Sequence, residues 1–263
     1  MKVAILYICT GKYNQFFKGF FESCEKYLLK DIAQLEYYVF TDDMSLSDEA
    51  NVHLIKKECA GFPADSLFRF DMFLQVRQEL EKADYIYFFN SNAEFKASVG
   101  EEILPLNGEK LVGAEWPAKR KPFNHPMFYP YERNKHSTAY IAPHESKPYI
   151  YYMGGINGGV STDYIGMIET LSENIRNDYE NGIIAIVHDE SHINKYFRRH
   201  NCKVLSAEYC YPEEWIVNGF SPKIIFRDKV KIDPYFNKGR DYSLKGKIKK
   251  SIMLVCRAVQ WYI

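Results

Sequence analysis

"YIYFFNSNAEF", residues 85–95, joins an almost unbroken apolar run to two asparagines that stand one residue apart. A short apolar run of this kind predicts a strand that is buried on both faces, as in a sheet covered by helices on both sides. Sheets of α/β proteins bind ligands beyond the carboxyl ends of their strands. Asn90, Ser91 and Asn92 are therefore candidate ligand-binding residues.

The rest of the chain predicts strands that alternate with helices. Apolar residues recur at helical spacing after Phe16 and again after Val160, and Ser66 is expected to cap a further helix. "HDESHINKYFRRH" predicts another helix from about Glu190 onward. Strands are expected at residues 3–9, 35–43, 52–57 and 84–90, from Tyr149 into two Gly pairs, and between Gly182 and His188. This order predicts an α/β layer fold.

The length, charge and cysteine content of the chain exclude several classes of protein. The chain has 263 residues, 46% of them hydrophobic, which is enough for one large domain with a sizeable core. Its formal net charge is zero, which argues against a general nucleic-acid binder. The six cysteines are scattered without a C-x-x-C pair, so reduced thiols in the cytoplasm are expected. No apolar run approaches the roughly 18 residues that span a bilayer.

The segment "HDESH" (188–192) allows two interpretations. His188 and His192 stand four residues apart, as in a zinc protease, but Asp189 takes the place of the general base and no third ligand can be located. The interpretation that fits better is an acidic pair at a helix entrance, with Glu190 facing a cleft. Helix capping alone also favours carboxylates at this position.

Two further patterns indicate a ligand. In "YYMGGINGG" (151–159), Gly154 and Gly155 let the backbone approach a ligand closely, although the spacing is not that of a dinucleotide site. Arg69 lies in the first turn of its expected helix, where a cation opposes the dipole. It therefore needs a partner, either Asp65 or an anionic ligand.

Residues 241–263 differ from the rest. Six basic residues and one acidic residue lie between Lys238 and Lys250, and the apolar, aromatic-ended "SIMLVCRAVQWYI" follows. Such a basic amphipathic segment is typical of peripheral contact with an anionic membrane. A solvated or disordered C-terminal segment is the alternative.

Six stretches, taken in order, resemble glycosyltransferase family 6, the family of the ABO blood-group transferases and α-1,3-galactosyltransferases. They are "KYNQFFKGFFESCEKY", "YYVFTD", "SLFRFDMF", "DYIYFFNSNAEF", "YYMGGINGG" and "GIIAIVHDESHINKYFRRHNCKVLSAEY". The resemblance implies a GT-A fold, with a Rossmann-like mixed sheet flanked by helices, over residues 1–240. It also implies transfer of galactose or N-acetylgalactosamine (GalNAc) from a UDP-sugar to O3 of a galactoside, with retention.

The resemblance also assigns residues by motif. Glu190 takes the place of the key catalytic carboxylate, and His125 that of an acceptor-contacting histidine. The donor is expected to meet Ile8, Cys9, Thr10, Tyr13, Arg69, Asn90, Ser91, Asn92, Met153, Gly154, Gly155 and Asp189. Glu213 lies near the place of an acceptor-contacting aspartate, and Val187 stands where the family has an aromatic residue.

The main departure is Asn90-Ser91-Asn92, where animal members carry D-x-D. Neutral amides are poor ligands for a hard cation, so the resemblance is to the bacterial, metal-independent branch, and no cofactor is expected. Basic residues must then stabilise the diphosphate, and Lys231 is the first candidate, followed by Arg240 and Lys238. A catalytically decayed glycan-binding module is the alternative of another class.

Donor and acceptor follow from the same resemblance. Gly155 is expected to leave space for an acetamido group, whereas Met153 is what a galactose-preferring relative carries. Weighting the space more, we expect UDP-GalNAc as donor and a fucosylated galactoside as acceptor, with UDP-galactose as the alternative donor.

Overall fold

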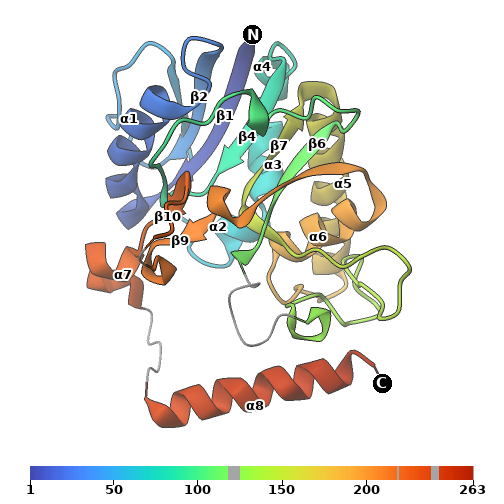
Figure 1. Cartoon of the computed structure of the whole chain (residues 1–263). Helices are drawn as coiled ribbons and strands as arrows, with labels where there is room; N and C mark the ends of the chain where they lie inside the picture. Colours follow the sequence, from blue (N-terminus) through green and yellow to red (C-terminus); the bar gives the residue numbers. More distant parts are fainter. Residues whose placement is uncertain (118–124, 218, 238–242, 263) are drawn as a thin grey trace.

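The computed structural model describes residues 1–117, 125–217, 219–237 and 243–262. Its centre is a seven-stranded mixed sheet in the order β3-β2-β1-β4-β7-β6-β8 (Figure 1). The strands are β1 (Lys2–Cys9), β2 (Gln34–Thr41), β3 (Val52–Lys56), β4 (Tyr85–Phe89), β6 (Leu111–Glu115), β7 (Tyr152–Val160) and β8 (Cys202–Leu205). The first four strands are parallel, and β7 runs antiparallel to both β4 and β6. The predicted fold class, a mixed sheet flanked by helices, is confirmed.

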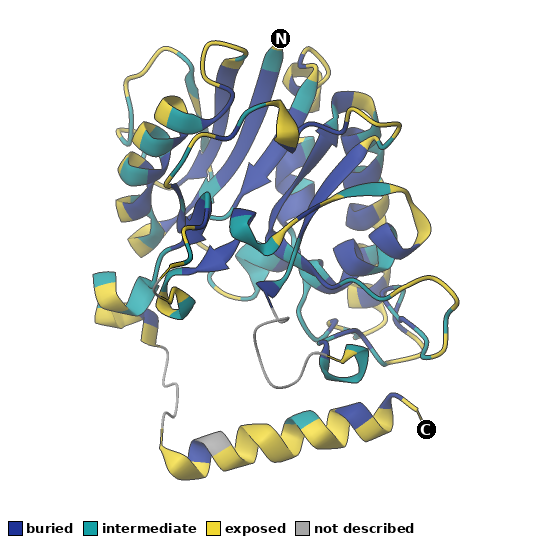
Figure 2. Cartoon of the chain, in the orientation of Figure 1, coloured by how far each residue is buried: buried dark blue, intermediate teal, exposed yellow. Residues whose placement is uncertain are grey.

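Helices cover both faces of this sheet. In β1, Val3, Ile5 and Tyr7 pack against α1 (Phe17–Tyr27), while Ala4 and Leu6 belong to the core of the opposite face. The helices of that opposite face are α3 (Arg69–Leu74), α5 (Ser161–Glu180) and α6 (Asp189–Arg199). Figure 2 shows the sheet as the most deeply buried layer. β4 is therefore apolar along nearly its whole length because helices cover both faces of the sheet, as the sequence predicted.

A small second sheet and several short helices complete the fold, and the second sheet lies near the carboxyl edge of β1 and β4 (Figure 1). A small second sheet joins β5 (Ala93–Phe95), β10 (Ile224–Phe226) and β9 (Tyr211–Pro212). Within the described residues, the short helices are α2 (Ala64–Leu67), α4 (Arg77–Leu80), α7 (Lys229–Ile232) and six 3-10 turns, at Gly11–Phe16, Glu101–Ile103, Pro126–Phe128, Ala207–Tyr209, Glu213–Trp215 and Pro234–Asn237. The last helix, α8 (Leu244–Gln260), crosses below this edge of the sheet (Figure 1).

Two expectations about secondary structure are wrong. Ser66 lies inside α2 and caps nothing, because the chain forms three short helices, α2 to α4, in place of one long helix. The apolar segment between Gly182 and His188 is not a strand. Its Ile186 backbone N–H donates to the Glu132 carboxylate at 2.7 Å and so does not serve a sheet ladder. The boundary expected at residue 240 lies outside the described residues.

Candidate active site

Two adjoining cavities open at the carboxyl edge of β1 and β4. The first has a volume of about 220 Å³ and the second about 310 Å³. Phe62, Ser66, Arg69 and Asn90 line both cavities, so the two cavities are adjacent. This is the position at which α/β sheets bind ligands.

The first cavity contains most of the residues expected to bind uridine. Ile8, Thr10, Tyr13 and Ser91 line it. Cys9 does not, because it alternates to the other face of β1, where burial raises the pKa of its thiol to about 12. Its side chain therefore cannot contact a ligand there, which leaves only its backbone for the expected role.

Arg69 lies between the two cavities and is almost completely buried. Its Nη2 lies 2.6 Å from an Asp189 carboxylate oxygen and donates to the Gly154 carbonyl at 2.9 Å. Its Nε is buried without a hydrogen-bond partner among the described residues. The expected local partner, Asp65, is instead bound by Lys57 and by the Gly61 backbone N–H. The cation is thus held by α6, and one of its donors remains free for an anionic ligand.

Glu190 forms part of the wall of the second cavity, in the first turn of α6. Tyr151 Oη donates to one carboxylate oxygen, and the Gly154 backbone N–H donates to the other at 2.6 Å. Desolvation raises the pKa of Glu190 to about 7, although these two hydrogen bonds favour the ionised form. The neighbouring Asp189 is also desolvated, and its pKa is raised while Arg69 opposes the rise. A carboxyl group with a raised pKa in a cavity wall is typical of a catalytic residue.

Gly154 and Gly155, the first two glycines of β7, make room for protein groups. A Cβ at Gly154 would lie 2.9 Å from Glu190, so only glycine lets this carboxylate approach the backbone. A Cβ at Gly155 would lie 2.6 Å from the Phe226 ring. The expectation that Gly155 leaves space for a donor acetamido group is therefore not supported, because that direction is filled by Phe226. Met153 packs against the core and lies outside both cavity walls.

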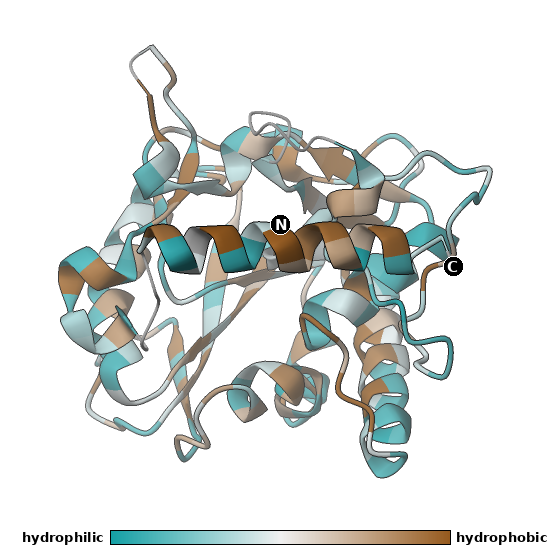
Figure 3. Cartoon of the chain, turned by 90° about the horizontal axis from the view of Figure 1, so that it is seen from below, coloured by the Kyte–Doolittle hydropathy of each residue, from teal (hydrophilic) through white to brown (hydrophobic). Residues whose placement is uncertain are grey.

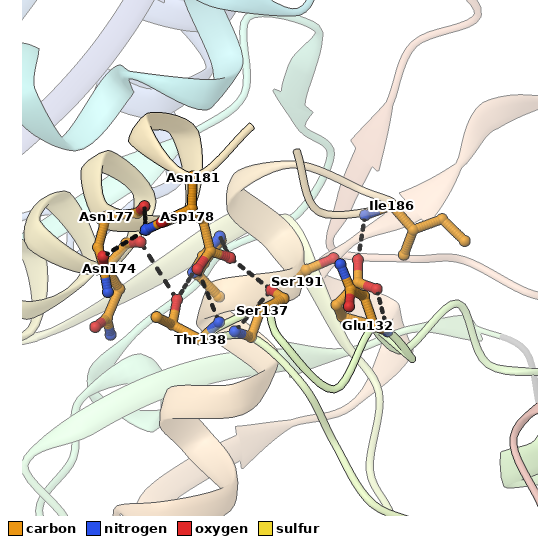
Figure 4. Close-up of polar contacts among 12 residues, drawn as sticks. Glu132, Ser137, Thr138, Asn174, Asn177, Asp178, Asn181, Ile186 and Ser191 are labelled. Atoms are coloured by element: carbon orange, nitrogen blue, oxygen red, sulfur yellow. Dashed lines mark hydrogen bonds and ion pairs between the residues drawn. The ribbon is translucent and has the colours of Figure 1, made fainter. Parts of the chain in front are cut away.

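A buried polar network fixes the segment that leads into α6 (Figure 4). Glu132 accepts a hydrogen bond from the Ile186 backbone N–H at 2.7 Å, and Asp178 accepts from Ser137 Oγ and from the Thr138 backbone N–H. His192 lies beside Asp178 in the same region, and burial lowers its pKa to about 4. His192 is therefore a neutral structural residue.

The arrangement does not fit a zinc site. His188 precedes α6 and packs edge-on against Phe62 at a centroid distance of 4.9 Å, on a different side from His192. No group of three potential metal ligands occurs among the described residues.

Of the two asparagines after β4, one lines the cavities and the other binds the protein backbone. Asn90 lines both cavities, and its side-chain oxygen accepts from the Ser91 backbone N–H. Asn92 lines neither, and its Nδ2 donates to the Arg227 carbonyl at 2.8 Å. Asp189, a carboxylate of α6 that lines the second cavity, is already bound to Arg69. Of the two asparagines only Asn90 reaches the cavities, and its neutral amide is a weaker ligand for a hard cation than a carboxylate would be.

The other expected site residues lie away from the cavity walls. His125 is exposed and accepts from the Met127 backbone N–H, and Glu213 accepts from the Asp228 backbone N–H at 2.7 Å. Lys231 is exposed on α7 and lines neither cavity. Lys238 and Arg240 lie outside the described residues.

Two residues of the site were not singled out from the sequence, although Lys229 belongs to the same basic stretch as Lys231, Lys238 and Arg240. Lys229, two positions before Lys231, lines the first cavity with its ammonium 5.1 Å from the centre of the Tyr13 ring. Tyr151, whose hydroxyl donates to Glu190, is one of 21 tyrosines in the chain. Only its position directly before "YMGG" distinguishes it in the sequence.

Comparison with known proteins agrees with this geometry. The model of glycosyltransferase family 6 matches residues 1–227. The O-antigen biosynthesis glycosyltransferase WbnI of Escherichia coli is 34% identical over 239 residues, which are 90% of this chain and 99% of WbnI. The histo-blood group ABO system transferase 1 of Rattus norvegicus is 30% identical over 222 residues. A globoside α-1,3-N-acetylgalactosaminyltransferase 1 from Gallus gallus is 28% identical over 226 residues.

The coverage of these relatives differs. The last two matches each include 81% of this chain but only 61% and 62% of the animal proteins. The mixed sheet with helices on both faces is consistent with the GT-A type of glycosyltransferase fold. The chain belongs to glycosyltransferase family 6.

Proposed function

We propose that the protein is a retaining α-1,3-N-acetylgalactosaminyltransferase. It would move GalNAc from UDP-GalNAc to O3 of galactose in a fucosylated (Fucα1-2Gal) glycan without a divalent metal. The observation that carries the proposal is the position of Glu190. Its carboxylate, with a pKa of about 7, lies in the wall of a cavity adjacent to the first cavity, which is lined by cationic and aromatic side chains that suit a nucleotide.

The two cavities suggest how donor and acceptor are arranged. UDP would occupy the first cavity, between Tyr13 and the end of β4, and the transferred sugar would enter the second cavity beside Glu190. The bond between C1 and the diphosphate oxygen breaks, and a bond between C1 and O3 forms on the same face, while the O3 proton leaves to the departing phosphate. Ionised Glu190 would stabilise the cationic sugar or attack it, as retention requires one of these routes.

Basic residues supply the charge for a metal-free reaction. Lys12, Arg69 and Lys229 all line the first cavity, where the leaving diphosphate gains negative charge. The Asn90 amide replaces a carboxylate that would otherwise repel this anion. Asn90 is placed to donate a hydrogen bond to the donor from either cavity.

The choice of GalNAc over galactose rests on likeness alone. The relative from Gallus gallus is named for N-acetylgalactosamine transfer to globoside. Because Phe226 fills the space beside Gly155, that glycine does not contribute to the choice. UDP-galactose is therefore the second candidate donor.

We also place the protein in the cytoplasm, with peripheral contact at the inner face of the membrane through residues 241–263. The basic amphipathic character of that segment supports this location. No helix in the described parts of the chain has the length and apolarity to cross a bilayer.

One assay tests the reaction. UDP release from UDP-GalNAc and from UDP-galactose is measured with 2'-fucosyllactose as acceptor, in excess EDTA. We expect release from UDP-GalNAc at a rate unchanged by EDTA. A faster rate with UDP-galactose would overturn the donor choice, and loss of activity with EDTA would overturn metal independence. Binding of the glycan without any UDP release would favour the glycan-binding module.

A further inference from the structure

The C-terminal helix α8 is attached to the rest of the protein mainly at one end. Trp261, directly after the helix, is buried, and its indole N–H donates to the Ile141 carbonyl at 2.8 Å. Its ring packs on Tyr131 and Tyr149 of an aromatic cluster, and Ala258 is also buried. This docking fixes the orientation of α8 about its own axis, which the sequence alone did not.

The same orientation leaves a second face of α8 largely exposed. Five large apolar side chains on this face recur at intervals of four or three residues, and each is at least 50% exposed. At about 100° per residue they fall within an arc of about 80°. We call this set the apolar stripe: Leu244, Ile248, Ile252, Val255 and Val259. A contiguous stripe of this kind marks an interaction surface, because single exposed apolar residues are common but aligned ones are not.

The charges around the stripe identify its partner. From Ser243 to Tyr262 the chain has no acidic residue, and Lys245, Lys249, Lys250 and Arg257 are exposed on the helix. A helix with a narrow apolar face, lysines beside it and no acidic group is complementary to an anionic lipid surface. A second copy of this chain would bring the same positive charges together, which disfavours it as the occupant.

We propose that α8 lies flat on an anionic lipid bilayer, with the apolar stripe inserted between the headgroups. Figures 1 and 3 show α8 crossing the side of the molecule toward which β1 and β4 point, and apolar bands are visible along its length. The cavities open at that same edge of the sheet. The bilayer would therefore face the active-site side of the protein, within reach of an acceptor displayed on the same membrane.

Flotation with lipid vesicles tests the proposal. The full chain is mixed with vesicles of phosphatidylcholine, with or without about one third phosphatidylglycerol. We expect wild type to float with the anionic vesicles only. The affinity of the I248Q/I252Q variant for these vesicles should be lower by at least about tenfold. The matched control is M253Q, because Met253 is also exposed but lies outside the stripe, and its binding should stay within about twofold of wild type. Unchanged melting temperatures would show that all variants fold.

Three results would overturn the proposal. The first is failure of the wild type to float with anionic vesicles, and the second is a loss of vesicle binding in M253Q as large as that in I248Q/I252Q. The third is a doubling of the mass in solution that depends on the stripe, without vesicle binding, which would make the stripe an interface between copies. A second arm, which rests on the proposed function, compares transfer to a fucosylated galactoside attached to lipid in the vesicles with transfer to the free glycan. I248Q/I252Q should slow only the former. Absence of both transfers would refute the proposed function and leave the flotation result standing.

Discussion

The two cavities share Arg69 but use polar groups in different ways. In the first cavity the other cations lie near the surface, with Lys12 paired to Asp233 and Lys229 over the Tyr13 ring. In the second cavity the charged groups are removed from water, so Asp189 is bound to Arg69 and the pKa of Glu190 is raised. Exposed cations attract an anion at little cost, whereas desolvated carboxylates change their chemistry. The first cavity is thus suited to binding and the second to reaction.

The largest effect is expected at Glu190. Replacement by Gln keeps the size of the side chain but removes its charge, so kcat should fall by about 10³-fold, in the range seen when one stabilising group is lost. The affinity for UDP, measured by calorimetry, should change less than about threefold, because the proposed UDP site is the other cavity. A kcat above a tenth of wild type would remove Glu190 from the reaction.

The same variant should change the pH dependence of stability. The pKa of Glu190 is about 7 in the folded protein and 4.5 as its ordinary value. The wild type therefore loses stability as the pH rises between these values, since its folded state holds the proton more tightly. E190Q lacks this loss, so its melting temperature should exceed that of wild type above pH 7 and approach it near pH 4.5.

The next effect separates two lysines of α7. Lys229 lines the first cavity and Lys231 does not, although the sequence favours Lys231. We expect K229A to lower kcat/KM for the UDP-sugar about 30-fold, which corresponds to about 2 kcal/mol of transition-state stabilisation. The reason is the loss of a positive charge beside the proposed diphosphate site. K231A is the matched control and should stay within about twofold of wild type. The reverse order would restore Lys231 as the residue that binds the diphosphate.

This pair shows where sequence reasoning succeeds and fails. Local patterns predicted the strands of the parallel half and α1, α5 and α6, because apolar periodicity records which face is buried. They predicted that Arg69 needs a partner and offered Asp65, four residues away, or an anionic ligand. The actual partner, Asp189, is 120 positions away in the sequence and is brought close only by the packing of α3 against α5 and of α5 against α6.

The glycines of β7 give a second case. Their spacing correctly indicated close approach, but whether the approaching group is a ligand or the protein itself depends on side-chain positions. Glu190 fills the space at Gly154, and Phe226 fills it at Gly155. The apolar segment 183–187 likewise has the composition of a strand, yet its backbone is bound by Glu132 from a distant loop. Contacts of this kind are not encoded in local periodicity.

A smaller effect is expected at Tyr151, which links the second cavity to the aromatic cluster. Its hydroxyl stabilises ionised Glu190, so Y151F should raise the pKa of that carboxyl and move the acid limb of the kcat/KM profile up by about one pH unit. At pH 7 the rate should fall about fivefold and recover at higher pH. Y131F is the matched control, because Tyr131 Oη donates to the Ile150 carbonyl and not to Glu190. A rate loss that is the same at every pH would mean that Tyr151 only supports the fold.

The smallest effect concerns Gly155 and decides what its missing side chain is for. A Cβ there would lie 2.6 Å from the Phe226 ring, so G155A should destabilise the protein by about 1–3 kcal/mol. The control is G166A, at a helical position with nothing within 4 Å, which should be neutral or stabilising by about 0.5–1 kcal/mol. If Phe226 is the reason for Gly155, the ratio of rates with UDP-GalNAc and UDP-galactose should not change in G155A. A shift of that ratio toward UDP-galactose, with stability unchanged, would instead show that the donor sugar occupies the space beside Gly155.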